Sequence, residues 1–245
     1  MTSTKAIGDF VDREFARESA FLAELVKVPS DNPPGDCWAH AQRARELLEQ
    51  LGLTVEAHEV PRSTVEAAGM KSVTNLIVRH RFGEGPVIAL NAHGDVVPPG
   101  LGWHFDPYGA VVEDGPHGPV MYGRGVAVSK SDFATYTWTL LALKALAAGG
   151  GKLRGTLELH FTYDEEVGGI VGPKWLLDEK LTRPDAAIAL WQERSSVGSS
   201  VVQSAFTWNF FRMPCVLNSG VASRALAFRQ MRAALDSSSN SSMPK

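Results

Sequence analysis

The chain has 245 residues, of which 44% are hydrophobic and 21% charged, and its formal net charge is −3. This composition is typical of a globular protein with enough apolar side chains for one sizeable core, and it gives no indication of nucleic acid binding. Two cysteines argue against a disulfide framework, no apolar stretch approaches the roughly 18 residues of a membrane span, and the N-terminus lacks the apolar core of a signal peptide. We therefore expect a cytoplasmic protein that does not bind membranes.

The first half of the chain predicts two helices followed by strands. Apolar residues recur at helical spacing over residues 17–28 and again over 38–51, and a proline-rich loop at 29–36 separates the two segments. Strand patterns follow at 53–60, 75–80 and 86–91. The last of these is almost continuously apolar, which is typical of a strand buried on both faces.

The second half alternates helices and strands. Residues 132–148 predict a helix that ends at three glycines, 153–162 a strand, 173–181 a short helix, and 186–190 the start of another strand. Within 153–162, leucines alternate with Glu158 and His160, so we expect one face of this strand to be less buried. Strands that alternate with helices predict an α/β fold, a layered sheet with flanking helices.

The character of the sequence changes near Leu190. Residues 1–189 hold 18 Lys and Arg against 25 Asp and Glu, whereas residues 190–245 hold 6 against 2, together with twelve serines and no histidine. The serine-rich stretch at 236–242 has low complexity and predicts disorder. No second domain is predicted in this tail.

Two short polar segments follow apolar strands and carry candidate chemistry. His93 and Asp95 stand two residues apart after the strand at 86–91, so that one could bind a metal ion while the other orients it. The alternative for this pair is a histidine hydrogen-bonded locally to a turn aspartate.

The second segment, Asp164-Glu165-Glu166, follows the strand at 153–162, where a divalent cation would relieve the repulsion between neighbouring carboxylates. One carboxylate could then be a ligand and its neighbour the group that deprotonates water. A solvated acidic turn is the commoner meaning of such a triplet in isolation.

Several motifs in order resemble the zinc exopeptidase family of aminoacylase, carboxypeptidase G, acetylornithine deacetylase and succinyl-diaminopimelate desuccinylase. The resemblance covers roughly residues 17–189. It rests on Pro29-Ser30 with Asn32-Pro33-Pro34-Gly35, Asn75-Leu76-Ile77, His93-Gly94-Asp95-Val96-Val97-Pro98, Trp103 with Asp106-Pro107-Tyr108, Tyr122-Gly123-Arg124-Gly125, Lys130, and Asp164-Glu165-Glu166.

The resemblance implies a zinc-dependent hydrolase that cleaves an amide bond of a small peptide or N-acyl amino acid. It assigns His93 as a zinc ligand, Asp95 as its orienting partner, Glu165 as the general base and Glu166 as a ligand of the other metal ion. One or two zinc ions are expected. Intact relatives are homodimers.

The sequence departs from the family pattern at several ligand positions. Val128 occupies the position of the aspartate that bridges two metals, and valine cannot be a ligand; Asp132 lies four residues further on, in the predicted helix, and is expected to face elsewhere. Glu193 is a poorly registered candidate for a further acidic ligand, and no histidine follows His160. These departures speak against a second metal ion.

We therefore expect an incomplete zinc-exopeptidase-like catalytic domain at 1–189, and an atypical tail at 190–245 that is either outside the native reading frame or disordered. Neither activity nor dimerisation is predicted for such a fragment. The competing hypothesis is a non-catalytic relative that binds a small carboxylate or a protein partner.

Overall fold

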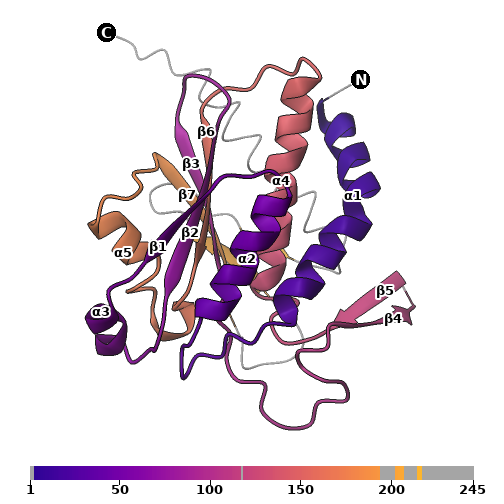
Figure 1. Cartoon of the computed structure of the whole chain (residues 1–245). Helices are drawn as coiled ribbons and strands as arrows, with labels where there is room; N and C mark the ends of the chain where they lie inside the picture. The colour runs from indigo at the N-terminus through magenta and orange to yellow at the C-terminus, as the bar shows by residue number, and fades with distance from the viewer. Residues whose placement is uncertain (1–2, 117, 194–201, 207–213, 217–245) are drawn as a thin grey trace.

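The computed structural model describes residues 3–116, 118–193, 202–206 and 214–216, with side chains as far as residue 189. The chain forms the layered α/β fold that the sequence predicts (Figure 1). Its first half contains helices and strands in the order α1 Ser3–Val26, α2 Trp38–Gln50, β1 Val55–Glu59, α3 Arg62–Ala67, β2 Thr74–Arg81 and β3 Val87–His93. Helix α1 thus begins well before the predicted segment at 17–28.

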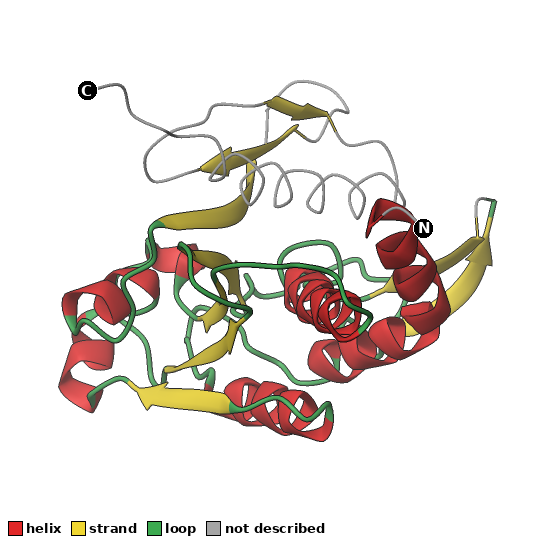
Figure 2. Cartoon of the chain, turned by 90° about the horizontal axis from the view of Figure 1, so that it is seen from above, coloured by secondary structure: helices red, strands yellow, loops and turns green. Residues whose placement is uncertain are grey.

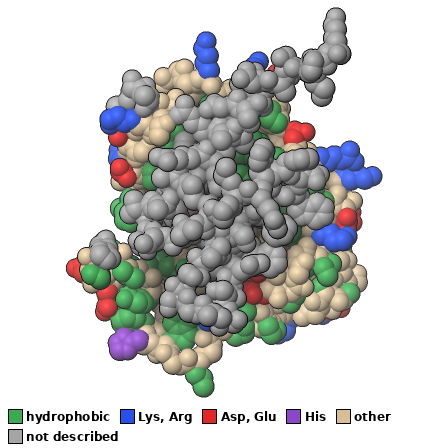
Figure 3. Space-filling view, turned by 180° about the vertical axis from the view of Figure 1, so that it is seen from behind, with side chains coloured by type: hydrophobic (Ala, Val, Ile, Leu, Met, Phe, Trp, Pro, Cys, Tyr) green, Lys and Arg blue, Asp and Glu red, His purple; other side chains and the backbone are tan. Residues whose placement is uncertain are grey.

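The second half begins with a hairpin that the sequence did not predict, formed by β4 Val111–Gly115 and β5 Gly118–Tyr122. The remaining elements are α4 Lys130–Ala148, β6 Thr156–Thr162, a 3₁₀ turn η1 at Glu165–Val167, α5 Pro173–Asp178, β7 Ala186–Glu193, β8 Val202–Phe206 and β9 Pro214–Val216. The hairpin exposes three large apolar side chains, Val112, Val120 and Tyr122. Seen from behind, hydrophobic side chains lie beside acidic ones on the side of the molecule that carries the hairpin (Figure 3).

The main sheet has seven strands in the order β1-β2-β6-β3-β7-β8-β9. Strands β6, β3 and β7 are parallel neighbours, and the other pairs are antiparallel. Helix α4 lies on the connection from β3 to β6, as a crossover between parallel strands requires. Parallel pairing brings the carboxyl ends of β3 and β6 to one edge of the sheet.

Helices α1, α2 and α4 form a layer on one face of the sheet (Figures 1 and 2). Their contact with the strands is apolar: Leu25, Leu48 and Trp138 from the three helices are buried, as are Leu76 and Leu90 from the sheet. None of the described helices has both the length and the apolar character needed to cross a membrane.

The opposite face of β6 is also buried, so the prediction of a less buried face there was wrong. Glu158 and His160 are both almost fully covered. The segment after α5 brings Thr182 over this face, where its Oγ1 donates to Glu158 Oε2 at 2.5 Å; His160 Nε2 lies 2.8 Å from the same oxygen, and Arg79 Nη1 3.4 Å from Oε1. The polar residues are therefore buried because they are partners of one another.

The structure describes only short parts of the tail. Strand β7 continues to Glu193, and β8 and β9 extend the sheet, so these parts are not irregular. Of Glu193 only the backbone pairing with Val202 is described. Residues 194–201, 207–213 and 217–245, which include the stretch predicted to be disordered, lie outside the described residues.

Candidate metal centre

The candidate centre lies at the carboxyl ends of β3 and β6. His93 is the last residue of β3 and pairs in register with Thr162, the last residue of β6. The acidic segment that follows Thr162 therefore emerges beside His93, although about seventy residues separate the two in the chain. This pairing places a histidine and two glutamates at one strand edge.

Gly94 allows the chain to turn tightly after His93. Its N–H donates to Thr162 O at 2.9 Å, and a Cβ at this position would lie 2.5 Å from Tyr163 Cε1 and 3.0 Å from Phe133 Cζ. Both rings are fully buried, and the Tyr163 hydroxyl is 2.8 Å from His40 Nδ1. Only a residue without a side chain fits above this aromatic pair.

Asp95 connects the two halves of the centre. Its carboxylate is fully buried and accepts the backbone N–H of Glu165 on Oδ1 and that of Glu166 on Oδ2, both at 3.3 Å, and the Asn32 amide on Oδ2 at 2.9 Å. Burial opposes the charged form, but the hydrogen bond and charge of His93, together with hydrogen bonds from the Asp164 backbone and the Asn32 amide, lower the pKa of Asp95. A carboxylate that accepts several N–H groups stays ionised.

His93 Nδ1 lies 2.9 Å from the backbone carbonyl oxygen of Asp95 and 3.5 Å from its carboxylate. The shorter contact therefore goes to the carbonyl, and the role of the Asp95 carboxylate as orienting partner of the imidazole stays a prediction. Because Nδ1 has this acceptor, Nε2 is the nitrogen left for a ligand. Burial would lower the pKa of His93, but the hydrogen bond and charge of Asp95 and the charge of Glu165 raise it to about 9.

Three potential ligands converge at this point. Ligand atoms of His93, Glu165 and Glu166 all lie within 4.8 Å of one another, and no other such group of acidic, histidine or cysteine residues occurs in the part of the chain that the structure describes. His93 Nε2 is 3.9 Å from Glu165 Oε2, and the Glu165 side chain is 39% exposed. Burial and the negative charge of Glu165 raise the pKa of Glu166, because the two ionised carboxylates repel each other.

An imidazole and two carboxylates fit a divalent metal ion such as zinc. Ligands about 2.1 Å from one ion are about 3.4 Å apart in a tetrahedron, so these side chains need only a small contraction to reach it. Because two of the three groups are exposed or half-buried, a water molecule or substrate can approach them. The set therefore suits one metal ion with an open position.

Asp164 shapes the turn that carries the two glutamates. It has a φ of 123°, which is unusual for a residue with a side chain, and its carboxylate accepts Val171 N at 2.5 Å and Gly172 N at 3.1 Å. Burial raises its pKa to about 7, with a contribution from the charge of Asp95, while the backbone donors act against the shift. Asp164 is thus occupied in holding the loop, a role that the sequence did not assign to it.

The two residues at which the sequence departs from the family's bridging ligand do not join the group. Val128 has no donor atom, and Asp132 is buried in the first turn of α4, where its carboxylate accepts Ser129 Oγ at 2.8 Å. Burial raises the pKa of Asp132 to about 6, and the charge of His93 opposes the shift. Asp132 is therefore not one of the converging ligands.

Two motifs of the sequence hold loops near the centre. Lys130 is fully buried and donates from Nζ to Val28 O at 2.9 Å and Leu25 O at 3.3 Å, which satisfies carbonyls at the C-terminal end of α1. Arg124 donates to Pro99 O at 3.1 Å and lies 5.2 Å from the centre of the Trp103 ring. Lys130 and Arg124 therefore contribute to the centre by fixing the backbone of the loops beside it.

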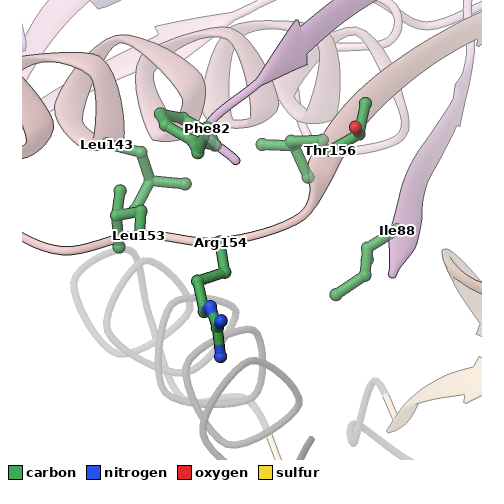
Figure 4. Close-up of a pocket in the computed structure, with 7 residues that line it drawn as sticks. Phe82, Ile88, Leu143, Leu153, Arg154 and Thr156 are labelled. Atoms are coloured by element: carbon green, nitrogen blue, oxygen red, sulfur yellow. The ribbon is translucent and has the colours of Figure 1, made fainter. Parts of the chain in front are cut away.

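A small apolar pocket lies elsewhere. Figure 4 shows Phe82, Leu143 and Leu153 facing one another in it, while the Arg154 side chain extends away. Its residues Ile88 and Thr156 stand at the starts of β3 and β6, opposite the strand ends that carry His93 and the glutamates. It is too small for a substrate and plays no part in the centre.

Comparison with known proteins identifies relatives. A family model described as Peptidase family M20/M25/M40 matches residues 89–242. Succinyl-diaminopimelate desuccinylase of Acidiphilium cryptum is 35% identical over 145 residues, which are 55% of this chain and 36% of that protein. The desuccinylase of Wolinella succinogenes is 39% identical over 157 residues, 64% of this chain and 36% of that protein. The chain thus spans about a third of the length of these relatives.

Solved structures share the fold at lower identity. Human carnosine dipeptidase 1 has a TM-score of 0.58 at 18% identity, over 78% of this chain and 42% of that one. The di-peptidase Dug1p of Saccharomyces cerevisiae has a TM-score of 0.57 at 19% identity, over 74% of this chain and 38% of that one. These structures confirm the zinc-exopeptidase-like layered architecture that the motifs predicted.

Proposed function

Because the chain belongs to peptidase family M20/M25/M40, we propose that it carries the metal-binding part of a hydrolase that cleaves an amide bond in a small peptide or an N-acyl amino acid. The observation that carries the proposal is the convergence of His93, Glu165 and Glu166 at one strand edge, held by a buried Asp95. The desuccinylase relatives favour an N-acyl amino acid, and the dipeptidase folds are compatible with a short peptide.

His93 Nε2 and the Glu166 carboxylate, which the family resemblance gives to two different ions, would here hold one zinc ion, because their ligand atoms lie within 4.8 Å of each other. A bound zinc ion lowers the pKa of water to about 7 and polarises the amide carbonyl. The Glu165 side chain is exposed, and its Oε2 lies 3.9 Å from His93 Nε2. It would accept a proton from the attacking water and return it to the leaving nitrogen, as general acid–base catalysis requires.

The direct test is the substitution Glu165→Gln, assayed with the zinc-supplemented chain on N-succinyl and N-acetyl amino acids and on dipeptides. We expect turnover to fall by about 10²- to 10⁴-fold because the general base is lost. Glu59→Gln, which changes an exposed glutamate on the edge strand β1, is the matched control and should leave the rate unchanged. Equal rates for Glu165→Gln and wild type would refute the assignment of Glu165.

A second candidate, a non-catalytic binding protein, is favoured by one observation. With Glu165 as base, the described residues supply only His93 and Glu166 as ligands, whereas catalytic zinc commonly has three protein ligands, and Val128 adds none. Calorimetric binding of an N-acyl amino acid without turnover at any zinc concentration would support this alternative. Turnover that depends on Glu165 would exclude it.

A further inference from the structure

The segment Ser30–Asn32 runs alongside the turn that follows His93. Asn32 N donates to Val96 O at 2.8 Å, and Val96 N donates to Ser30 O at 3.1 Å, which makes a short parallel bridge. Ser30 Oγ donates to Gly94 O at 2.6 Å. A segment some sixty residues earlier in the chain is thus docked along the backbone of the candidate centre.

Asn32 also reaches the centre with its side chain. It is 1% exposed, and its Nδ2 donates to Asp95 Oδ2 at 2.9 Å. Its Oδ1 is buried without a hydrogen-bond partner, so the amide is buried at a free-energy cost. The contact that offsets this cost is the charge-assisted bond to Asp95.

The segment Ser30–Asn32, which carries this amide, is fixed by contacts just before it and within it. Lys130 bonds the carbonyls of Leu25 and Val28 just before it, and the Tyr108 hydroxyl donates to Asp31 within it. The position of the Asn32 amide is therefore fixed by contacts within the fold.

We propose that Asn32 is a positioning residue for the candidate metal centre. Its side-chain amide holds the Asp95 carboxylate in the orientation that accepts the backbone N–H groups of Glu165 and Glu166. Asp95 Oδ2 accepts both Asn32 and the Glu166 N–H, and Oδ1 accepts the Glu165 N–H. Without the short bond to Asn32, Oδ2 keeps only the 3.3 Å bond from the Glu166 N–H, and a rotation of the carboxylate lengthens both 3.3 Å bonds together. The glutamates then lose their fixed distance from His93. This inference rests on the proposed metal-dependent function.

Amide hydrogen exchange tests the positioning role in the metal-free chain. Asn32→Leu keeps the size of the side chain and removes the donor, and Asn32→Ala serves as a second variant should the leucine disturb folding. Ser30→Ala is the matched control, because it removes a bond from the same segment to the same turn without touching the Asp95 carboxylate. We expect residues 163–168 to exchange about 10-fold faster in both Asn32 variants and at the wild-type rate in Ser30→Ala.

Metal affinity gives a second readout. Cobalt(II) titrations, followed by visible absorption, should show a dissociation constant about 10- to 100-fold higher in the Asn32 variants than in wild type and Ser30→Ala. Wild-type exchange at 163–168 in the Asn32 variants, or equal acceleration by Ser30→Ala, would overturn the inference. Absence of cobalt binding by the wild-type chain would refute the proposed metal centre, and the exchange rates would still decide the role of Asn32.

Discussion

Replacing Gly94 by alanine should damage the candidate centre through steric overlap alone. The φ angle of Gly94 is not positive, so alanine meets no backbone strain there, but its Cβ would lie 2.5 Å from Tyr163 Cε1. The ring cannot move away easily, because its hydroxyl bonds to His40 and Phe133 lies on another side at 3.0 Å from the new atom. Phe133 is itself stacked on Phe161, with ring centres 4.2 Å apart.

Overpacking of this kind typically costs about 1–3 kcal/mol, which corresponds to a decrease in Tm of about 2–12 °C for a chain of this size. The same chemical change at Gly8 is the control, because a Cβ there meets nothing within 4 Å and the position is inside helix α1. Gly8→Ala should stabilise the chain by about 0.5–1 kcal/mol through helix propensity.

Urea unfolding followed by circular dichroism measures both changes, and cobalt titration reports the centre. We expect Gly94→Ala to lower the unfolding midpoint and weaken cobalt binding, and Gly8→Ala to raise the midpoint without an effect on cobalt. Equal midpoints for the two variants would show that the aromatic rings beneath Gly94 yield, and the steric argument would fail.

Three further predictions concern charge. Burial would lower the pKa of His93, but Asp95 more than offsets this effect and the pKa is about 9. Below that pH a metal ion must displace a proton from His93, so the affinity for the metal ion, measured by calorimetry, should rise about tenfold per pH unit from pH 6 to 8. An affinity that does not change with pH would contradict this. Burial opposes ionisation of Glu158, but hydrogen bonds from His160 and Thr182 lower its pKa below 4.5, so its stabilisation is complete above pH 4.5 and is lost as the pH falls through the lower folded value. Glu158→Gln should cost about 1–3 kcal/mol in urea unfolding at pH 7 and progressively less as the pH falls below 4.5, and a loss that does not change with pH would contradict this. Arg124→Ala should free the loop at Trp103 and speed its proteolysis, with at most about 1 kcal/mol of global destabilisation; unchanged cleavage would show that the loop is held otherwise.

The candidate ligands could be found in the sequence because each follows an apolar run that ends a strand. The parallel register that brings His93 to Glu165 could only be expected from the α/β pattern. The partners of Asp95 were beyond reach, since Asn32 is 63 positions away and its contact depends on how one loop docks on another. The motif that contains Asn32 was visible in the sequence, but the hydrogen bond from Asn32 to Asp95 was not.

Errors in the fold prediction have similar causes. Alternation in β6 predicted an uncovered face, because nothing local shows that Thr182 folds back over Glu158. The first half of α1 was missed because its few apolar residues, such as Ile7, are sparse among charges and only their packing makes it part of the layer. Local patterns report propensity, whereas burial is decided by distant segments.

Strand order has a consequence for how the molecule is made. Strand β6 lies between β2 and β3, both of which leave the ribosome before it. At about 5–20 residues per second, the roughly 70 residues between His93 and the glutamates take about 4–14 s to synthesise. During that time β3 has no neighbour on the side that β6 will occupy, and the late arrival of this central strand both joins β2 to β3 and completes the ligand set. The joining of these two strands and the assembly of the ligand set are therefore a single event in the synthesis of the chain.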